Sequence, residues 1–316
     1  MDKIVCVLLA LLPVLSAQAA PQSPAEVEQA LLQRLLVTGQ QSYQGTFIYE
    51  RNGSFSTHAI WHQRDANGQV RERLLQLDGP AQEVLRLDGH VQCVSDAQAD
   101  RPEWVSGLLM QPVPVAQLAA HYETRLLGPS RVAGHAAVVL ALLPRDQYRY
   151  GLELHLDQHT GLVLKSLLLN GQGQLLERFQ FTHLDSRSPL NPTALQPSSA
   201  CLPVSVAPAL PAVESPWQAG WLPPGFSLSA AQQRNAQGAH PALTWLMFSD
   251  GLARFSVFIE ALPNAAVEHL HSQLGPTVIV SRQMPAADGP VLVTVVGEVP
   301  LPAAERVAQS ITLAAP

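Results

Sequence analysis

The chain has 316 residues, with 19 Lys and Arg against 25 Asp and Glu, so its formal net charge is −6 at neutral pH. This acidic balance argues against nucleic-acid binding, which uses basic patches. A chain of this length is too long for one comfortable hydrophobic core, so we expect two domains.

The first nineteen residues are typical of a cleavable secretory signal peptide. Lys3 supplies a positive charge, residues 4–15 are almost all apolar, and Ala17-Gln18-Ala19 fits a small-x-small cleavage site. The apolar stretch is shorter than the ~20 residues that a membrane-spanning helix needs. Cys6 lies too early to become a lipidated mature N-terminus. We therefore expect this segment, residues 1–19, to be removed and the mature protein to be soluble and extracytoplasmic.

Residues 20–190 are predicted to form the first domain, which opens with a helix. Ser23 can cap this helix, Pro24 fits its first turn, and Glu26 completes a capping box. The apolar stripe of the helix extends to Leu35.

A chain of antiparallel strands is predicted between Tyr43 and Thr182. Apolar and polar residues alternate along each run, as in strands with one buried face. The runs are separated by pairs that tolerate the positive φ of tight hairpin turns: Asn52-Gly53, Asn67-Gly68, Asp78-Gly79, Asp88-Gly89 and Asn170-Gly171.

A long antiparallel sheet must curl over and close, or leave one large face that needs a cover. Residues 136–143 are apolar throughout, which predicts a central strand covered on both sides. Residues 115–122 are predicted to form a short helix that can lie across the sheet as a lid. We expect the function to lie on the covered face.

The two remaining cysteines, Cys93 and Cys201, leave two interpretations open. In an oxidising compartment they can pair, and closing a loop of about 110 residues would stabilise the fold by roughly 4 kcal/mol. Otherwise they are two separate thiols, one in a strand and one in a linker.

Residues 191–216 are predicted to be an extended, semi-stiff linker, because prolines recur through this segment without helix or strand periodicity. Residues 217–316 are then a smaller α+β domain. Its predicted strands are residues 243–248, 253–260, 277–282 and 291–297, and its predicted helices are residues 263–273 and 302–311.

The sequence contains no convincing catalytic motif, since Gly-x-Ser-x-Gly, His-Glu-x-x-His, a Walker loop and a dinucleotide fingerprint are all missing. We therefore predict a protein that is not an enzyme and needs no cofactor or metal. His155 and His159 bracket the end of a strand, where they are ordinary polar residues. His58 and His62 share a strand face but lack a third metal ligand nearby in sequence.

Three arginines form a weak positive group. Arg71 and Arg73 share one face of a strand, and Arg86 lies on a neighbouring strand. Such a group could meet a phosphate or a carboxylate. The plainer interpretation is a solvated face that Glu72 and Glu83 balance.

Four aromatic residues of the first domain could line an apolar cavity: Phe47, Tyr49, Phe55 and Trp61. Clefts between an incomplete barrel and a lid hold apolar ligands. The plainer interpretation is that each of these residues belongs to the hydrophobic core.

Several motifs, taken in order, resemble the RseB/MucB family of periplasmic regulators of the envelope-stress sigma factor. In the first domain they are Tyr43-Gln44-Gly45-Thr46-Phe47-Ile48-Tyr49, Arg71-Glu72-Arg73-Leu74, Leu77-Asp78-Gly79, Glu83-Val84-Leu85-Arg86, Tyr148-Arg149-Tyr150-Gly151, Leu156-Asp157 and Thr160-Gly161-Leu162. In the second they are Trp221-Leu222-Pro223-Pro224-Gly225-Phe226, Phe255-Ser256-Val257-Phe258-Ile259-Glu260 and Val293-Thr294-Val295-Val296-Gly297-Glu298-Val299-Pro300. The resemblance covers nearly the whole mature chain, and the order and spacing of the motifs are specific.

The resemblance implies a mostly β protein with some helix. Its large domain would be an unclosed antiparallel β-barrel, like lipoprotein carriers, with helices in its mouth, and its second domain a small α+β unit. Such a protein works in the periplasm. It would bind the periplasmic part of a membrane-bound anti-sigma factor of the RseA or MucA type and shield it from regulated proteolysis. A lipid-type signal, such as lipid A or an acylated lipoprotein, would relieve the shielding, and the output includes alginate or exopolysaccharide control.

We hypothesise that an acyl chain in the cleft of the large domain favours a domain arrangement that binds the anti-sigma factor poorly. Four aromatic residues of the second domain are predicted to supply partner surface, unless they form its core: Trp245, Phe248, Phe255 and Phe258. A homodimer is also compatible with the sequence. The competing functions are a periplasmic lipid or lipoprotein carrier and a secreted hydrolase with a degenerate site.

Overall fold

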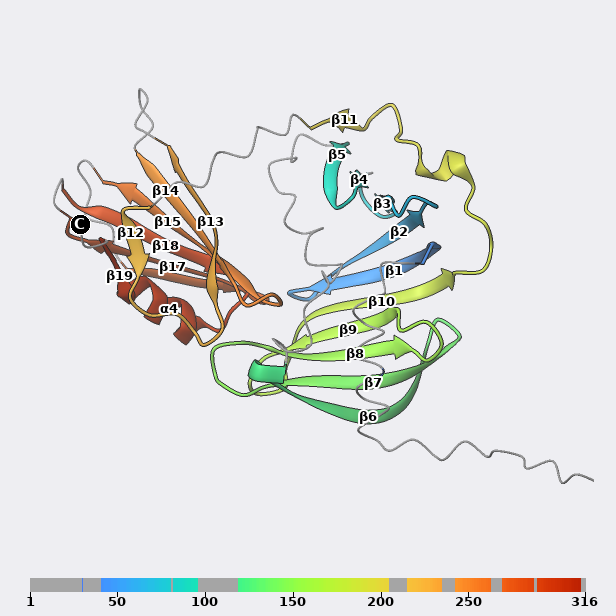
Figure 1. Ribbon diagram of the computed structural model, residues 1–316, viewed down its shortest axis with the longest axis horizontal. Helices are drawn as coiled ribbons and strands as arrows, with labels where there is room; N and C mark the ends of the chain where they lie inside the picture. The colour runs from blue at the N-terminus through green and yellow to red at the C-terminus, as the bar shows by residue number, and fades with distance from the viewer. Residues whose placement is uncertain are drawn as a thin grey trace, which may run out of the picture.

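The computed structural model describes residue 30 and residues 41–80, 82–95, 119–204, 215–234, 242–262, 269–286 and 289–313. The predicted signal peptide and most of the predicted helices at residues 23–35 and 115–122 lie outside these residues. Of the second helix, residues 119–121 are helical, and Tyr122 already begins a strand. The described chain forms a large curved sheet, a smaller sheet and a short two-stranded ribbon (Figure 1).

The large sheet has eleven strands, and its neighbours in space all run antiparallel. Its order is β11-β5-β4-β3-β2-β1-β10-β9-β8-β7-β6. The strands are β1 (Tyr43–Arg51), β2 (Ser54–Arg64), β3 (Val70–Gln76), β4 (Glu83–Leu87), β5 (His90–Val94), β6 (Tyr122–Val132), β7 (His135–Pro144), β8 (Gly151–Asp157), β9 (Val163–Leu169), β10 (Leu175–Asp185) and β11 (Leu202–Pro203). Within the described residues β6 and β11 are the two ends of this order, so the sheet curves without closing into a barrel (Figure 1). The predicted unclosed antiparallel barrel is confirmed.

Positive φ angles lie at the glycines of four predicted turns, at Gly53, Gly68, Gly79 and Gly89. The fifth turn differs, because Gly173 rather than Gly171 has a positive φ of 76°. The side-chain oxygen of Asn170 accepts hydrogen bonds from the backbone of residues 172 and 174. This wider loop moves the left-handed position two residues beyond the one that the Asn-Gly pair predicts.

Strand β7 pairs with β6 on one side and β8 on the other and is buried on both faces, as predicted for a central strand. Ala137 belongs to the large core cluster, while Leu140 and Leu142 belong to a second cluster with Tyr122. Leu252, from the small sheet, packs against this second cluster. The small sheet therefore contributes to covering the far face of β7, and an apolar strand near an edge needs such a cover.

The first part of the predicted linker folds onto the large sheet. Residues 192–195 form a 3₁₀ turn, η3 (Pro192–Leu195), whose Leu195 is buried, and β11 pairs with β5. Cys93 and Cys201 are joined in a disulfide with an S–S distance of 2.03 Å. The chain from residue 191 to residue 204 is thus fixed to the sheet, which the proline pattern did not predict.

The small sheet has six strands in the order β13-β14-β15-β18-β17-β16. They are β13 (Ser227–Arg234), β14 (Leu243–Ser249), β15 (Arg254–Ala261), β16 (Leu270–Leu274), β17 (Thr277–Met284) and β18 (Val291–Gly297). Helix α4 (Leu301–Ser310) packs on β17 and β18, with Ala304 and Val307 fully buried among their valines. A ribbon of β12 (Trp217–Ala219) and β19 (Ile311–Leu313) lies beside the sheet. The predicted C-terminal helix is confirmed.

The prediction of a helix over residues 263–273 is wrong where the structure describes this segment. Residues 270–274 form the edge strand β16, which pairs with β17 and leaves all five residues exposed. Leu270 and Leu274 are four residues apart, a spacing that also fits one face of a helix. Pairing with β17 decides between the two structures.

Among the described residues no helix is both long and apolar enough to span a bilayer.

Candidate functional site

The inner face of the large sheet carries an aromatic floor that crosses three neighbouring strands. Phe47 on β1 lies 4.8 Å from Phe179 and 6.1 Å from Phe181 on β10, measured between ring centroids. Tyr43 lies 6.1 Å from Phe181 in an edge-on arrangement. The four rings are almost fully buried and belong to one apolar cluster.

Two histidines of β2 complete this floor. His58 stacks on Phe47 at 5.1 Å, and His62 stacks on Tyr43 at 4.8 Å. Burial lowers the pKa of His58, although the negative charge of Asp78 opposes this. A neutral imidazole at this position packs like the aromatic rings around it. No group of three His, Cys, Asp or Glu side chains in the described part of the chain is placed to hold a metal ion.

The four aromatic residues predicted to line one cavity lie on opposite faces of the sheet. Phe47 and Tyr49 of β1 are opposite His58 and Ser56 of β2 on the inner face. Phe55 and Trp61 of β2 therefore point to the outer face, and Phe55 is 61% exposed. The prediction of a single cavity is corrected here, since alternation along β2 identifies residues that share a face without saying which face is inner.

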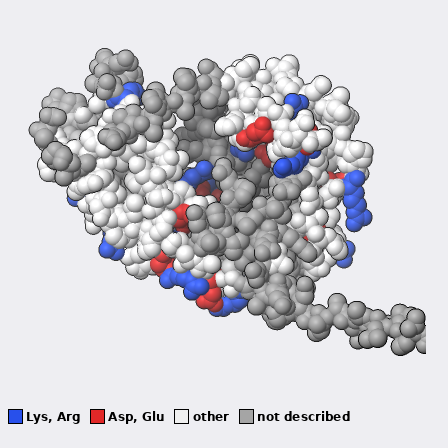
Figure 2. Space-filling view, viewed as in Figure 1, with Lys and Arg blue, Asp and Glu red and all other residues white. Residues whose placement is uncertain are grey.

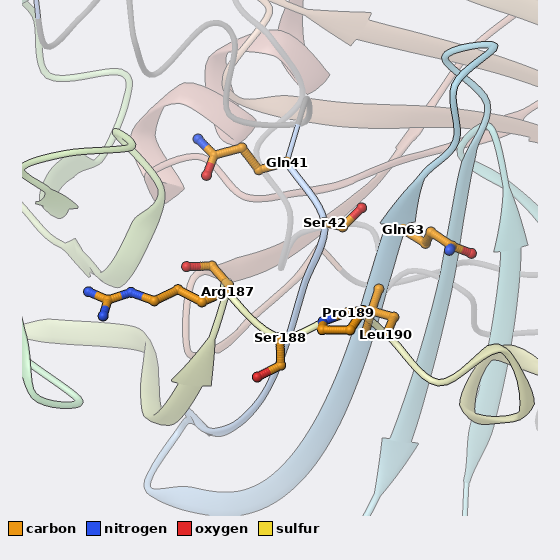
Figure 3. A pocket seen from close by; sticks show the side chains of 8 residues that line it. Gln41, Ser42, Gln63, Arg187, Ser188, Pro189 and Leu190 are labelled. Carbon is orange, nitrogen blue, oxygen red and sulfur yellow. The ribbon is translucent and has the colours of Figure 1, made fainter.

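An open depression of about 540 Å³ lies where the chain enters β1 and leaves β10 (Figure 3). Polar side chains supply much of its lining, so it is not the apolar cleft that the sequence predicts. The lining residues are Gln41, Ser42, Gln63, Ser186, Arg187, Ser188, Pro189 and Leu190.

The two sheets contact one another through a buried arginine on the segment between β7 and β8. Arg149 donates to Asp250 at 2.9 Å and lies 3.2 Å from Asp146, with its side chain completely buried. It also donates to the carbonyl of Pro224, and its guanidinium lies over the Phe226 ring, 5.4 Å from the centroid. One cation from the large sheet is thus enclosed by acceptors and an aromatic ring of the small one.

A second contact lies at the tip of the β1–β2 hairpin. Arg51 donates to Glu298 at 3.0 Å and to Thr277, both of the small sheet. It also lies 3.6 Å from Glu177, which accepts a hydrogen bond of 2.7 Å from Tyr49. Charged side chains of both signs gather at the boundary between the two lobes (Figure 2).

Glu177 is the most perturbed carboxyl of this contact. Burial raises its pKa to about 7, and the negative charge of Glu298 raises it as well, while the hydrogen bond from Tyr49 and the Arg51 cation oppose the rise. The contact between the sheets therefore contains an acid that changes charge near neutral pH.

Two motifs that carry the family resemblance, residues 148–151 and residues 221–226, meet at this boundary between the sheets. Tyr148 packs edge-on against Trp221 at 4.9 Å, and Arg306 of α4 lies over the Trp221 ring and donates to the Tyr148 hydroxyl at 2.8 Å. A Cβ atom at Gly225 would lie 2.0 Å from a ring nitrogen of His121, so only glycine allows this approach. These motifs therefore position the two sheets.

The four aromatic residues predicted as partner surface separate into two pairs. Phe248 and Phe255 are 3% and 2% exposed, stack at 5.3 Å and belong to the core under α4. Trp245 and Phe258 are opposite one another on β14 and β15, on the other face, and both are only half-buried. The surface over this lobe carries few charged side chains (Figure 2). The prediction is thus corrected for Phe248 and Phe255, which are core residues.

The three arginines noted in the sequence also separate. Arg73 pairs with Glu83 at 2.7 Å and lies over the outward-facing Trp61 ring. Arg71 shares that outer face by strand alternation, whereas Arg86 is opposite Glu72 on the inner face. They do not form one positive group.

Sequence reasoning missed the residues that join the sheets, above all Arg149 and Asp250. These two residues are 101 positions apart in the sequence, and no local sequence pattern links them. The one available signal was an arginine between two tyrosines in a short segment that joins two strands, because a cation flanked by aromatics favours a buried contact.

Comparison with known proteins identifies the family to which the chain is similar. A family profile described as the MucB/RseB N-terminal domain matches residues 27–199, and one described as the MucB/RseB C-terminal domain matches residues 211–312. The chain is 52% identical over 297 residues to the sigma factor AlgU regulatory protein MucB of Pseudomonas aeruginosa, covering 94% of both chains. It is 26% identical to the sigma-E factor regulatory protein RseB of Haemophilus influenzae, covering 85% of this chain and 86% of that one.

Three of the solved structures that resemble the chain match most of its length. One is described as MucB in complex with MucA(peri), with a TM-score of 0.81, 51% identity and coverage of 92% of this chain and 100% of that one. A second is described as the Pseudomonas aeruginosa MucA/MucB complex, with a TM-score of 0.82, 52% identity and coverage of 92% and 99%. The third is described as MucB, with a TM-score of 0.68 at 49% identity and coverage of 91% and 98%.

Proposed function

Because the chain belongs to the MucB/RseB family, we propose that it is a non-enzymatic periplasmic regulator of a sigma factor. It binds the periplasmic region of a membrane-bound anti-sigma factor of the MucA type. The observation that carries this proposal is the match along both sheets to MucB structures that contain MucA. The MucB relative at 52% identity is named as a regulator of the sigma factor AlgU.

Binding would protect the anti-sigma factor by covering the segment that a protease must reach. The fold suits this role because ion pairs join its two sheets. Arg149 and Asp250 fix one point and Arg51 and Glu298 another. A partner segment that binds across both sheets then stays bound only while these two ion pairs keep the sheets in place.

The partner surface is proposed to include Trp245 and Phe258. Half-buried aromatic side chains on a sheet face are typical centres of protein–protein interfaces. Phe248 and Phe255 are excluded from the proposed partner surface because they pack beneath α4.

Release is proposed to follow a lipid-type signal that changes the arrangement of the sheets. A ligand shifts such an equilibrium only by its different affinity for the two states. The lower TM-score of the structure described simply as MucB supports the existence of more than one arrangement, since its identity and coverage match those of the complexes.

The test combines the purified mature chain with the periplasmic region of Pseudomonas aeruginosa MucA. Isothermal titration calorimetry should show saturable binding, and the chain should slow proteolytic cleavage of the MucA region. Adding lipid A should then weaken binding. No binding to MucA would disprove the regulator, while binding that lipid A leaves unchanged would disprove only the release step.

A periplasmic lipid or lipoprotein carrier is the second candidate, and the buried aromatic floor of the open sheet favours it. Affinity capture from a solubilised envelope extract followed by mass spectrometry separates the two functions. Recovery of one anti-sigma factor supports the regulator, and recovery of many lipoproteins supports the carrier.

A further inference from the structure

The contact at the tip of the β1–β2 hairpin holds two acids around a single base. The Nη1 atom of Arg51 lies 3.6 Å from the carboxylate of Glu177, and its Nη2 atom lies 3.0 Å from that of Glu298. Arg51 and Glu177 belong to the large sheet, whereas Glu298 directly follows β18 of the small one. With both acids ionised this group carries one excess negative charge, and a proton on Glu177 makes it neutral.

The groups around Glu177 come from both sheets. The charged and polar side chains at this contact are Tyr49, Arg51, Thr277 and Glu298. Tyr49 donates to Glu177 at 2.7 Å, and Arg51 donates to the Tyr49 hydroxyl at 3.4 Å. On β9 the residue opposite Glu177 is Leu168, which brings no charge. Among the described residues Arg51 is therefore the only cation that an ion pair brings to these two acids.

The two sheets approach one another closely at this point. A Cβ atom on Gly275, in the turn between β16 and β17, would lie 3.3 Å from the Cγ atom of Arg51 and 3.4 Å from the carbonyl oxygen of Leu176. The side chains of Arg51 and Glu177 are 24% and 15% exposed. An excess charge in such an enclosed position is screened less than a charge at an open surface.

The proton on Glu177 is linked to this enclosure. Burial and the negative charge of Glu298 raise the pKa of Glu177 to about 7, although the hydrogen bond from Tyr49 and the cation of Arg51 lower it. When the small sheet moves away, Glu298 leaves and water enters, so the pKa returns toward its ordinary value of 4.5. Between these two values the joined arrangement holds a proton that the open one releases. The joined arrangement is therefore favoured below about pH 7 and weakened above it.

We propose that Glu177 is a proton-dependent latch between the two sheets. Its protonated form keeps the β1–β2 hairpin against the turn between β16 and β17, and its ionisation opens this contact. The buried pair of Arg149 and Asp250 holds the sheets together at the other contact. Opening is thus a rotation of one sheet relative to the other and not a separation.

The test measures the separation of the sheets in the full mature chain by electron paramagnetic resonance. Spin labels are attached at Ser54→Cys and Ser272→Cys, which are exposed positions of β2 and β16. The natural cysteines are joined in a disulfide and do not take the label. Between pH 5.5 and pH 8 the ratio of joined to open molecules should fall by about 30-fold, as the pKa values of about 7 and 4.5 require.

Glu177→Gln cannot ionise and should keep the short distance at both pH values. The matched control is Glu50→Gln, because Glu50 pairs with Arg178 at 3.3 Å within the large sheet and has a similar side-chain exposure of 17%. That variant should open at pH 8 like the natural chain. The latch is overturned if the distance in the natural chain does not change with pH, or if Glu177→Gln opens as the natural chain does.

Glu298→Gln separates the charge balance from a plain ion pair, and it decides the outcome if circular dichroism shows that Glu177→Gln is unfolded. In this variant one acid faces one cation, so the sheets should stay joined at pH 8. Opening at both pH values would mean that the ion pair between Arg51 and Glu298 alone holds this contact, and it would overturn the latch.

Discussion

Arg149 and Asp250 form a fully buried ion pair, with 2.9 Å between Nη1 and Oδ2, that joins the large sheet to the small one. Their side chains are 0% and 2% exposed. Removing one member of a buried pair leaves the other charge without compensation, which is far more costly than the pair is favourable. The geometry of the two sheets therefore depends on this contact more than on any surface ion pair.

Arg149→Met should lower the free energy of unfolding by about 3–5 kcal/mol, because it leaves Asp250 buried and unpaired. Urea unfolding followed by circular dichroism measures the change. The matched control is Arg125→Met, since the Arg125–Glu123 pair has a similar distance of 2.7 Å but its members are 57% and 51% exposed. That control should cost less than about 1 kcal/mol. Equal losses in both variants would contradict the role of the buried pair.

Stability should fall as the pH rises through neutrality, because the pKa of Glu177 is raised from 4.5 to about 7 in the folded protein. Between these values the folded state binds a proton that the unfolded state has released, so the unfolding free energy decreases with pH. The stabilising effect of the proton is complete below about pH 4.5 and is lost above about pH 7. Its full size is on the order of 3 kcal/mol.

Urea unfolding at about pH 5 and about pH 8 tests this effect, with Glu177→Gln as the comparison. The glutamine can still accept the hydrogen bond from Tyr49 but cannot ionise. The drop in stability between the two pH values should therefore be smaller in Glu177→Gln than in the natural chain. An identical drop in both proteins would show that other groups cause it.

Breaking the bridge between Cys93 and Cys201 should lower stability by roughly 4 kcal/mol, since it closes a loop with a sequence separation of 108. Cys93→Ser, Cys201→Ser and the double variant should lose the same amount, because each opens the same loop. Thiol titration of the unreduced natural chain should detect no free thiol from this pair. A double variant as stable as the natural chain would show that the bridge constrains little.

Much of the fold could be predicted because its local patterns are strong. The alternating valines of β18 and the paired turn residues after β1 identify strands and hairpins without tertiary information. Strand β16 could not be predicted, because Leu270 and Leu274 fit a helix until β17 pairs with them.

The candidate site was predicted less well, for a related reason. Phe55 and Trp61 share one face of β2, but only the pairing with β1 shows that this face is the outer one. The contact between Arg149 and Asp250 depends on how two separate sheets meet, and no short segment of sequence contains that information.

Trp245→Ala and Phe258→Ala should each weaken binding to the MucA periplasmic region by about tenfold or more, if these residues lie at the centre of the interface. The two side chains are opposite one another on β14 and β15 and are only half-buried, so truncating them should cost little stability. Calorimetric titration measures the affinity, and urea unfolding measures the stability of the same samples.

Phe255→Ala provides the matched control, because Phe255 lies on the same strand as Phe258 but is 2% exposed and packed in the core. It should lower the unfolding free energy by about 3–5 kcal/mol. The two classes of variant therefore separate a partner contact from core packing. Full affinity in both Trp245→Ala and Phe258→Ala would exclude this sheet face as the partner surface, and the partner would then have to bind elsewhere on the two sheets.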